Sequence, residues 1–404
     1  MLETIFTQTQ FRQRFPKPPA WRQEAFDAFQ RLPLPSAKEE AWRYTDLNGI
    51  DFSGIKPLAD VQTRFQGQGT HIQAGDKPFE KPAGKLAAWT QAFGNAVQID
   101  VATGTHARLE STVSLLQSGA LLQTVHVGAG AQLDFFEHYT SDDASLLFGQ
   151  KTVFHLAENA QLRYYAVQRF GPQTLSFTEK EFHLSDNARL TCFHADVGSR
   201  LSRTVIDHHF DGTNAKTPEH TAVFFGAQKQ HFDLSTHALH HGTDTTSDIV
   251  VKGALKDAAS CVYRGLIRID ANARKTDSFL QDRVLHLNKG VKSNSIPSLY
   301  IDNNDVKASH GATVSKLNDE SLFYLRSRGL SRATAEKLVV EGFLDELVQR
   351  LPHDGLRHQL QADLENKIII EAEKSTASGP RPAIANKKEK TVTQKNKAAG
   401  SKKK

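Results

Sequence analysis

Histidine is the residue type with the most evident potential for chemistry in this sequence, which contains 18 of them. An imidazole nitrogen binds transition metals and exchanges protons near neutral pH. His126, His155, His183 and His286 occupy the same position of a short repeated pattern. Stacked repeats would align these rings in a row that resembles a metal site. Because the alternation places them on the half-exposed face of a strand, we interpret the row as hydrogen-bonding and structural.

A second group of histidines lies between residues 208 and 241. Its members are His208, His209, His220, His231, His237, His240 and His241. The group contains no His-Glu-x-x-His motif, and adjacent histidines must point to opposite faces of a strand. We therefore expect structural roles for these residues as well.

Cysteine offers little further chemistry. The two cysteines, Cys192 and Cys261, are too few for a disulfide framework or a four-cysteine metal site. Each lies beside apolar residues, which is typical of a buried cysteine that acts as a small hydrophobe. The sequence also lacks the GxxxxGK[ST] loop, so we expect no ATP binding of that kind, and it lacks GxGxxG and GxSxG.

The most polar candidate segment is "YIDNNDVKASHGATVSKL", residues 300–317. Its composition predicts a loop that caps the strand-rich region. His310 precedes Gly311, which indicates a turn and an accessible imidazole. Composition alone favours a structural cap for this segment, with His310 as a metal ligand the alternative.

The elements that position these residues are strands. Apolar alternation with a period of two dominates residues 106–316. The repeated pattern appears as "VHVGAGAQLDFF" from Val125, "FHLAENAQLRYY" from Phe154 and "FHLSDNARLTCF" from Phe182. Further copies start at Ile267 and Leu285.

One position of the repeat carries Gly130, Asn159, Asn187, Asn272 or Gly290. Glycine and asparagine are the residues that best tolerate a positive φ, so each copy predicts a strand, a left-handed corner and a second strand. Such a unit buries its apolar face only against its neighbours. The pattern predicts a right-handed parallel β-helix. A Greek-key sandwich would also contain short alternating strands, but it would not explain a corner at one register.

Helical and irregular regions flank this core. Residues 1–105 are expected to contain a helix between Pro19 and Pro33, and another that starts at Ser36 with Glu39 completing a capping box.

A C-terminal helical domain is expected over residues 317–375. Its first helix would start after Asn318 and stop at Gly329, and its second would start at Ser331. A third is expected over 354–374. Residues 376–404 predict a disordered, Lys-rich tail.

Charge and targeting signals add constraints. The net charge of +5 comes from the last 19 residues, which hold eight Lys and one Glu, so the pI reflects a tail and not a nucleic-acid-binding surface. No secretory signal or membrane-length apolar run is present. These features predict a cytoplasmic protein with neither nucleic-acid nor membrane partners.

Three stretches resemble the SufB/SufD family of iron–sulfur cluster assembly proteins. The closing segment "DVKASHGATVSKLNDESLFYLRSRGLSRATAEKLVVEGFLDELV" is the most specific. "KEEAWRYTDL" is similar to the N-terminal signature of the SufD branch, and "HHGTDTTSDIVVKGALKDAASCVYRGLIRIDANARKTDSFLQ" to the central core. The resemblance covers residues 36–349, with gaps in the first third.

The resemblance implies a non-catalytic scaffold subunit of a SufBCD-type complex. Such a chain pairs through its β-helix with a SufB-like β-helix protein and docks a SufC-like ABC ATPase through its C-terminal helices. Tyr324, Phe343 and Leu344 are the docking candidates. The chain alone is expected to bind no cofactor stably, although a transient iron–sulfur cluster at the complex interface is consistent with the family.

The resemblance also implies that His310 contributes to that interface. Many relatives carry Cys two residues earlier, where this chain has Ala308, so thiolates must come from another chain. The alternative function is a β-helical carbohydrate-active enzyme, which would be expected to carry a secretory signal and a charged catalytic groove.

Overall fold

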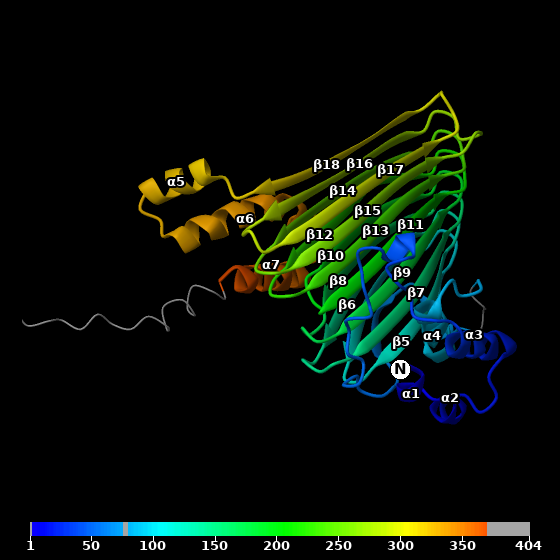
Figure 1. The fold of residues 1–404 in the computed structure, drawn as a ribbon. Coiled ribbons are helices and arrows are strands. Elements are labelled where there is room, and N and C mark those ends of the chain that lie inside the picture. Colours follow the sequence, from blue (N-terminus) through cyan, green and yellow to red (C-terminus); the bar gives the residue numbers. More distant parts are fainter. Residues whose placement is uncertain (1, 76–79, 370–404) are drawn as a thin grey trace, which may run out of the picture.

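The alternating sequence folds into successive coils, each of which contributes one strand to each of two facing sheets (Figure 1). The computed structural model describes residues 2–75 and 80–369. All pairs formed among the strands β3 to β18 are parallel. The predicted parallel β-helix core with helical flanks is therefore confirmed.

We name the two nine-stranded sheets after their last strands. The β18 sheet contains, in spatial order, β1 (Gln62–Gln68), β4 (His106–Leu115), β6 (Gln132–Ser141), β8 (Gln161–Arg169), β10 (Arg189–Asp196), β12 (Lys216–Gly226), β14 (Thr246–Leu255), β16 (Asp277–His286) and β18 (Lys307–Lys316). The β17 sheet contains β17 (Lys292–Ile301), β15 (Ser260–Ile269), β13 (His231–His240), β11 (Leu201–Phe210), β9 (Leu175–Leu184), β7 (Leu147–Leu156), β5 (Gly119–Val127), β3 (Asn95–Val101) and β2 (His71–Ala74).

Corners in left-handed conformation join the sheets, as the repeat predicts. Gly130, Asn159 and Asn187 have φ values of 64°, 58° and 58°. The next corner residue, Asn214, donates its side-chain amide to the Asn187 Oδ1 at 2.7 Å. Asparagine thus supplies both the backbone conformation and a hydrogen bond between coils.

The corners predicted at Asn272 and Gly290 are wrong. The corner between β15 and β16 has its positive φ at Lys275 (56°), not at Asn272. Gly290 lies on the opposite edge, between β16 and β17, and is not among the described residues with positive φ. The similarity of the copies is therefore local, because a second set of corners follows the other edge at Ser199, Gln228 and Asp257.

Apolar side chains from alternate strand positions fill the interior of the coils. Phe154 and Phe182 lie on adjacent strands and stack with 4.4 Å between ring centroids. Tyr164 contacts Phe154 from the facing sheet with ring centroids 5.2 Å apart. Interdigitated aromatic rings of this kind bind each coil to the next.

Four helices cover the outer face of the β17 sheet: α1 (Leu2–Ile5), α2 (Gln8–Arg14), α3 (Ala20–Arg31) and α4 (Lys85–Phe93). Helix α3 begins after Pro19 and ends before Pro33, as predicted. Phe11 and Phe26 stack at 4.2 Å within this layer, and Phe93 contacts both.

The helix predicted after Ser36 is wrong. Only a short 3-10 turn, Glu40–Trp42, forms there. The Ser36 amide donates to the Glu39 carboxylate at 2.9 Å, which is one half of the predicted capping box, but the N-cap of the turn is Glu39, which makes no side-chain cap hydrogen bond. Trp42 instead packs against the β17 sheet, with Arg203 over its ring at 4.2 Å, so tertiary contacts decide the local conformation.

Strands β1, β2 and β3 also lie in the segment interpreted as helical and irregular. β1 pairs antiparallel with β4, and β2 pairs antiparallel with β3. Strands β1 and β2 thus lie at the edges of the first coil, at the N-terminal end of the β-helix.

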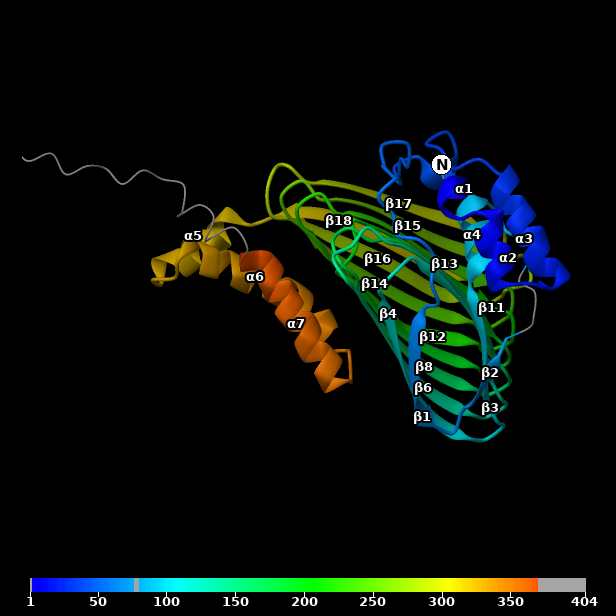
Figure 2. The same ribbon diagram turned by 90° about the horizontal axis from the view of Figure 1, so that it is seen from below.

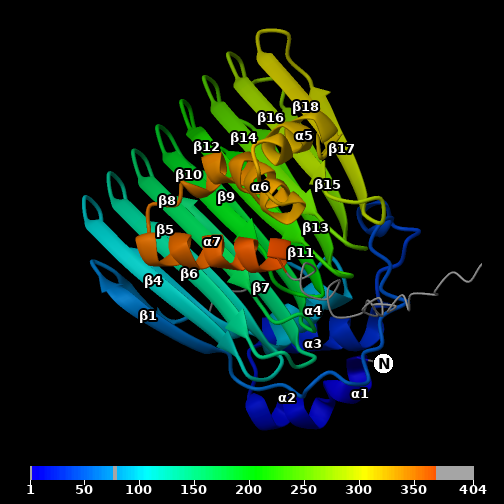
Figure 3. The same ribbon diagram turned by 90° about the vertical axis from the view of Figure 1, so that its left-hand side faces the viewer.

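Three helices follow the last strand: α5 (Asp319–Ser327), α6 (Arg332–Val348) and α7 (Asp354–Ile369). The predicted caps at Asn318 and Ser331 and the stop at Gly329, with φ of 93°, are confirmed. Helices α6 and α7 lie across the outer face of the β18 sheet, opposite the N-terminal helices (Figures 2 and 3). The end of the predicted third helix and the predicted tail lie outside the described residues.

None of the helices that the structure describes is both long enough and apolar enough to span a membrane.

Candidate functional site

His310 lies within strand β18, so the predicted capping loop is wrong at this point. The reason is pairing: β18 runs parallel to β16, with His310 opposite Leu280. Leu280 belongs to the interior cluster, so His310 occupies the inward-facing row of the last coil. No further coil follows among the described residues, and the His310 side chain is exposed.

The last coil leaves the C-terminal end of the β-helix open. Strands β17 and β18 each have a single partner strand in the described structure. Tyr300, Ile301 and Val314 are 63%, 40% and 50% exposed along this end. Unpaired backbone beside exposed apolar side chains is a template for pairing with another chain.

A buried carboxylate lies close to His310. Asp282 faces inward on β16 and is fully buried. Its Oδ1 accepts a hydrogen bond from the Ser295 hydroxyl at 2.8 Å, whereas Oδ2 has no partner among the described residues. Burial raises the pKa of Asp282 to about 6, although the nearby His310 opposes the shift. The last coils thus place an exposed imidazole near a buried carboxylate, and both groups bind iron in proteins.

Sequence reasoning missed Asp282. The signal was present, because Leu280, Asp282 and Val284 alternate along one strand and the flanking leucine and valine are buried. A charged residue in a row of buried apolar residues requires a compensating partner or a functional role, because burying an unpaired carboxylate is costly.

No thiol of this chain lies beside His310 on β18. Ala308, two residues before it on the same row, packs against the interior cluster. Cys192 and Cys261 are both buried, as predicted, on β10 and β15. Any thiolate at the open end would therefore have to come from another molecule.

The docking candidates differ in accessibility. Tyr324 on α5 is 57% exposed, and its neighbour Phe323, which the sequence analysis overlooked, is 74% exposed. Phe343 is partly buried, with the Lys252 Nζ 5.4 Å from its ring centroid. Leu344 is 1% exposed and packs between α6 and the β18 sheet. The exposed aromatic surface therefore belongs to α5, whereas Leu344 holds α6 in place.

The repeated histidines do form a row on the outer face of the β17 sheet. His126, His155, His183 and His209 stack with ring centroids 5.0, 5.4 and 4.4 Å apart. His286 is not part of it, because it ends β16 and bonds to the Ser293 hydroxyl at 2.7 Å. His183 also bonds to Asp211 at 3.0 Å, which raises its pKa.

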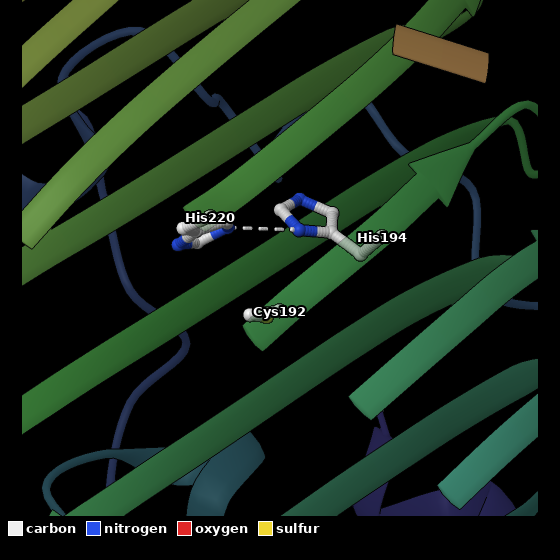
Figure 4. Close-up of side chains that lie close together, drawn as sticks. All are labelled: Cys192, His194 and His220. Atoms are coloured by element: carbon white, nitrogen blue, oxygen red, sulfur yellow. Dashed lines mark hydrogen bonds between the residues drawn. The ribbon is translucent and has the colours of Figure 1, made fainter. Parts of the chain in front are cut away.

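Three other potential ligands meet inside the coils. Cys192, His194 and His220 are all buried, and their donor atoms lie within 4.8 Å of one another (Figure 4). Spacing along the sequence did not predict this group, because Cys192 and His220 become neighbours only through the pairing of β10 with β12.

The comparisons with known proteins agree on one family. Residues 94–343 match the family described as "SUF system FeS cluster assembly, SufBD core domain". An iron–sulfur cluster assembly SufBD family protein of Mycobacterium leprae is 25% identical over 383 residues, which is 87% of this chain and 94% of the relative.

Two relatives bear the name "Iron-sulfur cluster assembly protein SufD". The one from Escherichia coli is 25% identical over 390 residues, covering 86% of this chain and 92% of the relative. The one from Bacillus subtilis is 33% identical over 171 residues, covering 42% and 38%. The family match spans more than half of the chain and the complete parallel part of the β-helix up to β18. This chain is therefore a member of the SufBD family of iron–sulfur cluster assembly proteins.

Proposed function

We propose that this chain is a non-catalytic scaffold subunit of a SufBCD-type complex for iron–sulfur cluster assembly. The observation that carries the proposal is the open C-terminal end of the β-helix, where His310 and Asp282 lie beside unpaired edge strands. The carbohydrate-active alternative is set aside, because the family match concerns cluster assembly.

Pairing with a SufB-like β-helix protein would provide hydrogen-bond partners for the unpaired edges of β17 and β18. A partner strand can hydrogen-bond to the free edge of β17 or β18, and its apolar residues can cover Tyr300, Ile301 and Val314. Burying such residues gains about 25 cal/mol for each Å² of apolar surface before the entropic cost of association is subtracted.

At that junction His310 would be an iron ligand and Asp282 a second one. An imidazole alone cannot hold a cluster, so the partner would supply the thiolates. The cluster is cargo in this scheme, present only transiently, and the isolated chain would not hold it stably. The carboxylate next to the imidazole favours ferrous iron, which prefers mixed nitrogen and oxygen ligands.

The ATPase would dock on α5. Phe323 and Tyr324 project from a helix that contacts α6 but is not part of the cluster packed on the β18 sheet. Exposed aromatic side chains on a helix are suited to a groove in a partner of the SufC-like ABC ATPase class. Phe343, half-buried beside Lys252, would lie at the margin of this surface.

Copurification from the native host tests the complex. The tagged chain should retain a β-helix partner and an ATPase, identified by mass spectrometry. Val314→Lys, which adds a charge to the free edge, should release the β-helix partner and leave the ATPase bound. A tagged chain that retains neither protein would refute the proposal.

Complementation tests the site. His310→Ala should lower the activity of iron–sulfur enzymes in cells that depend on this chain, while the purified variant keeps the circular dichroism of the wild type. Asp282→Asn should lower it as well, and Lys307→Ala, an exposed change on the same strand, is the matched control. Unchanged enzyme activity in His310→Ala would restrict His310 to packing.

A further inference from the structure

We propose that Cys192, His194 and His220 form a zinc-class divalent metal site inside the β-helix. It is distinct from the open end, and it stands whether or not the proposed scaffold function holds. The three side chains come from adjacent strands of the β18 sheet and lie close together, as Figure 4 shows, and Cys192 belongs to the interior cluster. A cysteine and two histidines match a donor set that Zn²⁺ uses in proteins.

Strand pairing creates the site. Cys192 and His194 are two residues apart on β10 and therefore face the same side. His220 is the register partner of Cys192 on β12. The pairing of β12 is irregular just before His220. The register of β12 with β10 shifts between Arg189 and Thr191 of β10. The register of β12 with β14 shifts between Thr217 and His220 of β12. Irregularities of this kind redirect side chains and commonly lie at functional sites.

The separation of the nitrogen atoms fits a tetrahedral ion. His220 Nε2 and His194 Nδ1 are 3.3 Å apart. Two nitrogen ligands at about 2.0–2.1 Å from Zn²⁺ with a tetrahedral angle are themselves about 3.3 Å apart. The Cys192 Sγ lies within 4.8 Å of both nitrogens, so a small rotamer adjustment completes three of the four positions.

The hydrogen bonds around the histidines leave one group unexplained. His208 Nε2 lies 2.8 Å from His220 Nδ1, which continues the chain of imidazoles from His194. Whichever tautomers are chosen, His208 Nδ1 has no partner in the described structure. Three imidazoles and a thiol in the core cost more than apolar residues of the same size unless they bind something.

The surroundings provide a second layer of contacts. His194 Nε2 lies 3.8 Å from Asp196 Oδ2, an oxygen that has no hydrogen-bond partner among the described residues. A carboxylate next to the distal nitrogen of a metal-bound histidine fixes the tautomer and strengthens the ligand. His208 holds His220 in the same way from the facing sheet.

A bound cation compensates the charge of the ligands. Lys180 is paired with Glu137 at 3.3 Å, so these two cancel. Metal binding displaces the proton of the Cys192 thiol, and the cation then compensates the negative charge of the buried thiolate.

X-ray absorption on the unmodified protein is the primary test. The full-length chain is produced in zinc-supplemented medium, dialysed against metal-free buffer and analysed for bound zinc. We expect one tightly held zinc with a single sulfur neighbour at about 2.3 Å and nitrogen neighbours at about 2.0 Å. A protein that retains no zinc, or zinc with only nitrogen and oxygen neighbours, would overturn the proposal. The latter result would point to the outer pair of His183 and His209 with Asp211.

Cobalt substitution tests the ligands individually. The protein, unfolded and refolded with Co²⁺, should show the sulfur-to-cobalt charge-transfer absorption of a thiolate complex. Cys192→Ser should abolish that absorption, and His220→Asn should weaken it at least tenfold at limiting Co²⁺. Cys261→Ser removes the other buried cysteine and should leave the absorption unchanged. Loss in Cys261→Ser with retention in Cys192→Ser would refute the assignment.

Discussion

Acid should destabilise this protein through histidines that the coils hold in the neutral state, and His240 allows the effect to be isolated. His240 is fully buried, stacks on Phe210 at 4.4 Å and bonds to the Thr245 hydroxyl at 2.8 Å. Burial lowers its pKa from 6.5 to about 3. It lies outside the proposed metal site, so bound zinc does not obscure its titration.

The sign and size of the effect follow from linkage. Below pH 6.5 the unfolded chain binds a proton at His240, whereas the folded chain does not until about pH 3. The contribution of His240 to the free energy of unfolding is therefore fully present above pH 6.5, and it is lost progressively as the pH drops toward 3. Each pH unit costs about 1.4 kcal/mol, so His240 alone removes about 2 kcal/mol between pH 7 and pH 5.

Urea unfolding at pH 7 and pH 5, followed by circular dichroism, measures this difference. His240→Gln is expected to be less stable at pH 7 but to lose about 2 kcal/mol less than the wild type on acidification. His358→Gln, at an exposed position of α7, is the matched control and should lose as much as the wild type. If His240→Gln and the wild type lost the same free energy, the argument from burial would be refuted.

Three further predictions concern backbone, packing and docking. Asn187→Val should destabilise the chain by about 1–3 kcal/mol through strain at its positive φ. Asn187→Gly should cost less, because it removes the hydrogen bond to Asn214 but introduces no strain. Urea unfolding of the two variants measures the difference. Gly253→Ala would place a Cβ 1.9 Å from the Phe224 ring and should lower the free energy of unfolding by about 1–3 kcal/mol. Gly342→Ala, in open space on α6, should raise the free energy of unfolding by up to about 1 kcal/mol. Equal melting temperatures for the two variants would contradict the close contact between Gly253 on β14 and Phe224. Phe323→Ser should weaken binding of the ATPase at least tenfold in surface plasmon resonance without lowering the melting temperature, and unaltered binding would move the docking surface away from α5.

The architecture could be predicted because its signals are local. Asn159 and Asn187 mark corners through a backbone conformation that few residues adopt, and alternation assigns the inward face between them. The corner at Lys275 could not be predicted in the same way, because neighbouring coils impose a positive φ on a residue that does not favour it. Likewise, Trp42 packs on a sheet formed by residues far along the chain, which no local capping signal can anticipate.

The chemistry of the interior was harder to predict, because it depends on which strands become neighbours. Cys192 and His220 are far apart in the sequence and adjacent in the sheet, and an irregularity in β12 sets their register. Conversely, Leu344 appears as a surface anchor in a helical pattern and is buried in the structure, since the β18 sheet covers the side of α6 that carries it. Register between distant strands, and the side of a helix that meets a sheet, are tertiary properties.

The two ends of the β-helix are unequal, and this limits how large an assembly can grow. At the first coil, antiparallel strands β1 and β2 occupy both edges, whereas β17 and β18 leave the last coil bare. A solenoid with two bare ends would add molecules indefinitely and form a fibre. Because β1 and β2 run antiparallel to the coils, the parallel winding can be extended only from β17 and β18, and association confined to that end would produce a discrete pair.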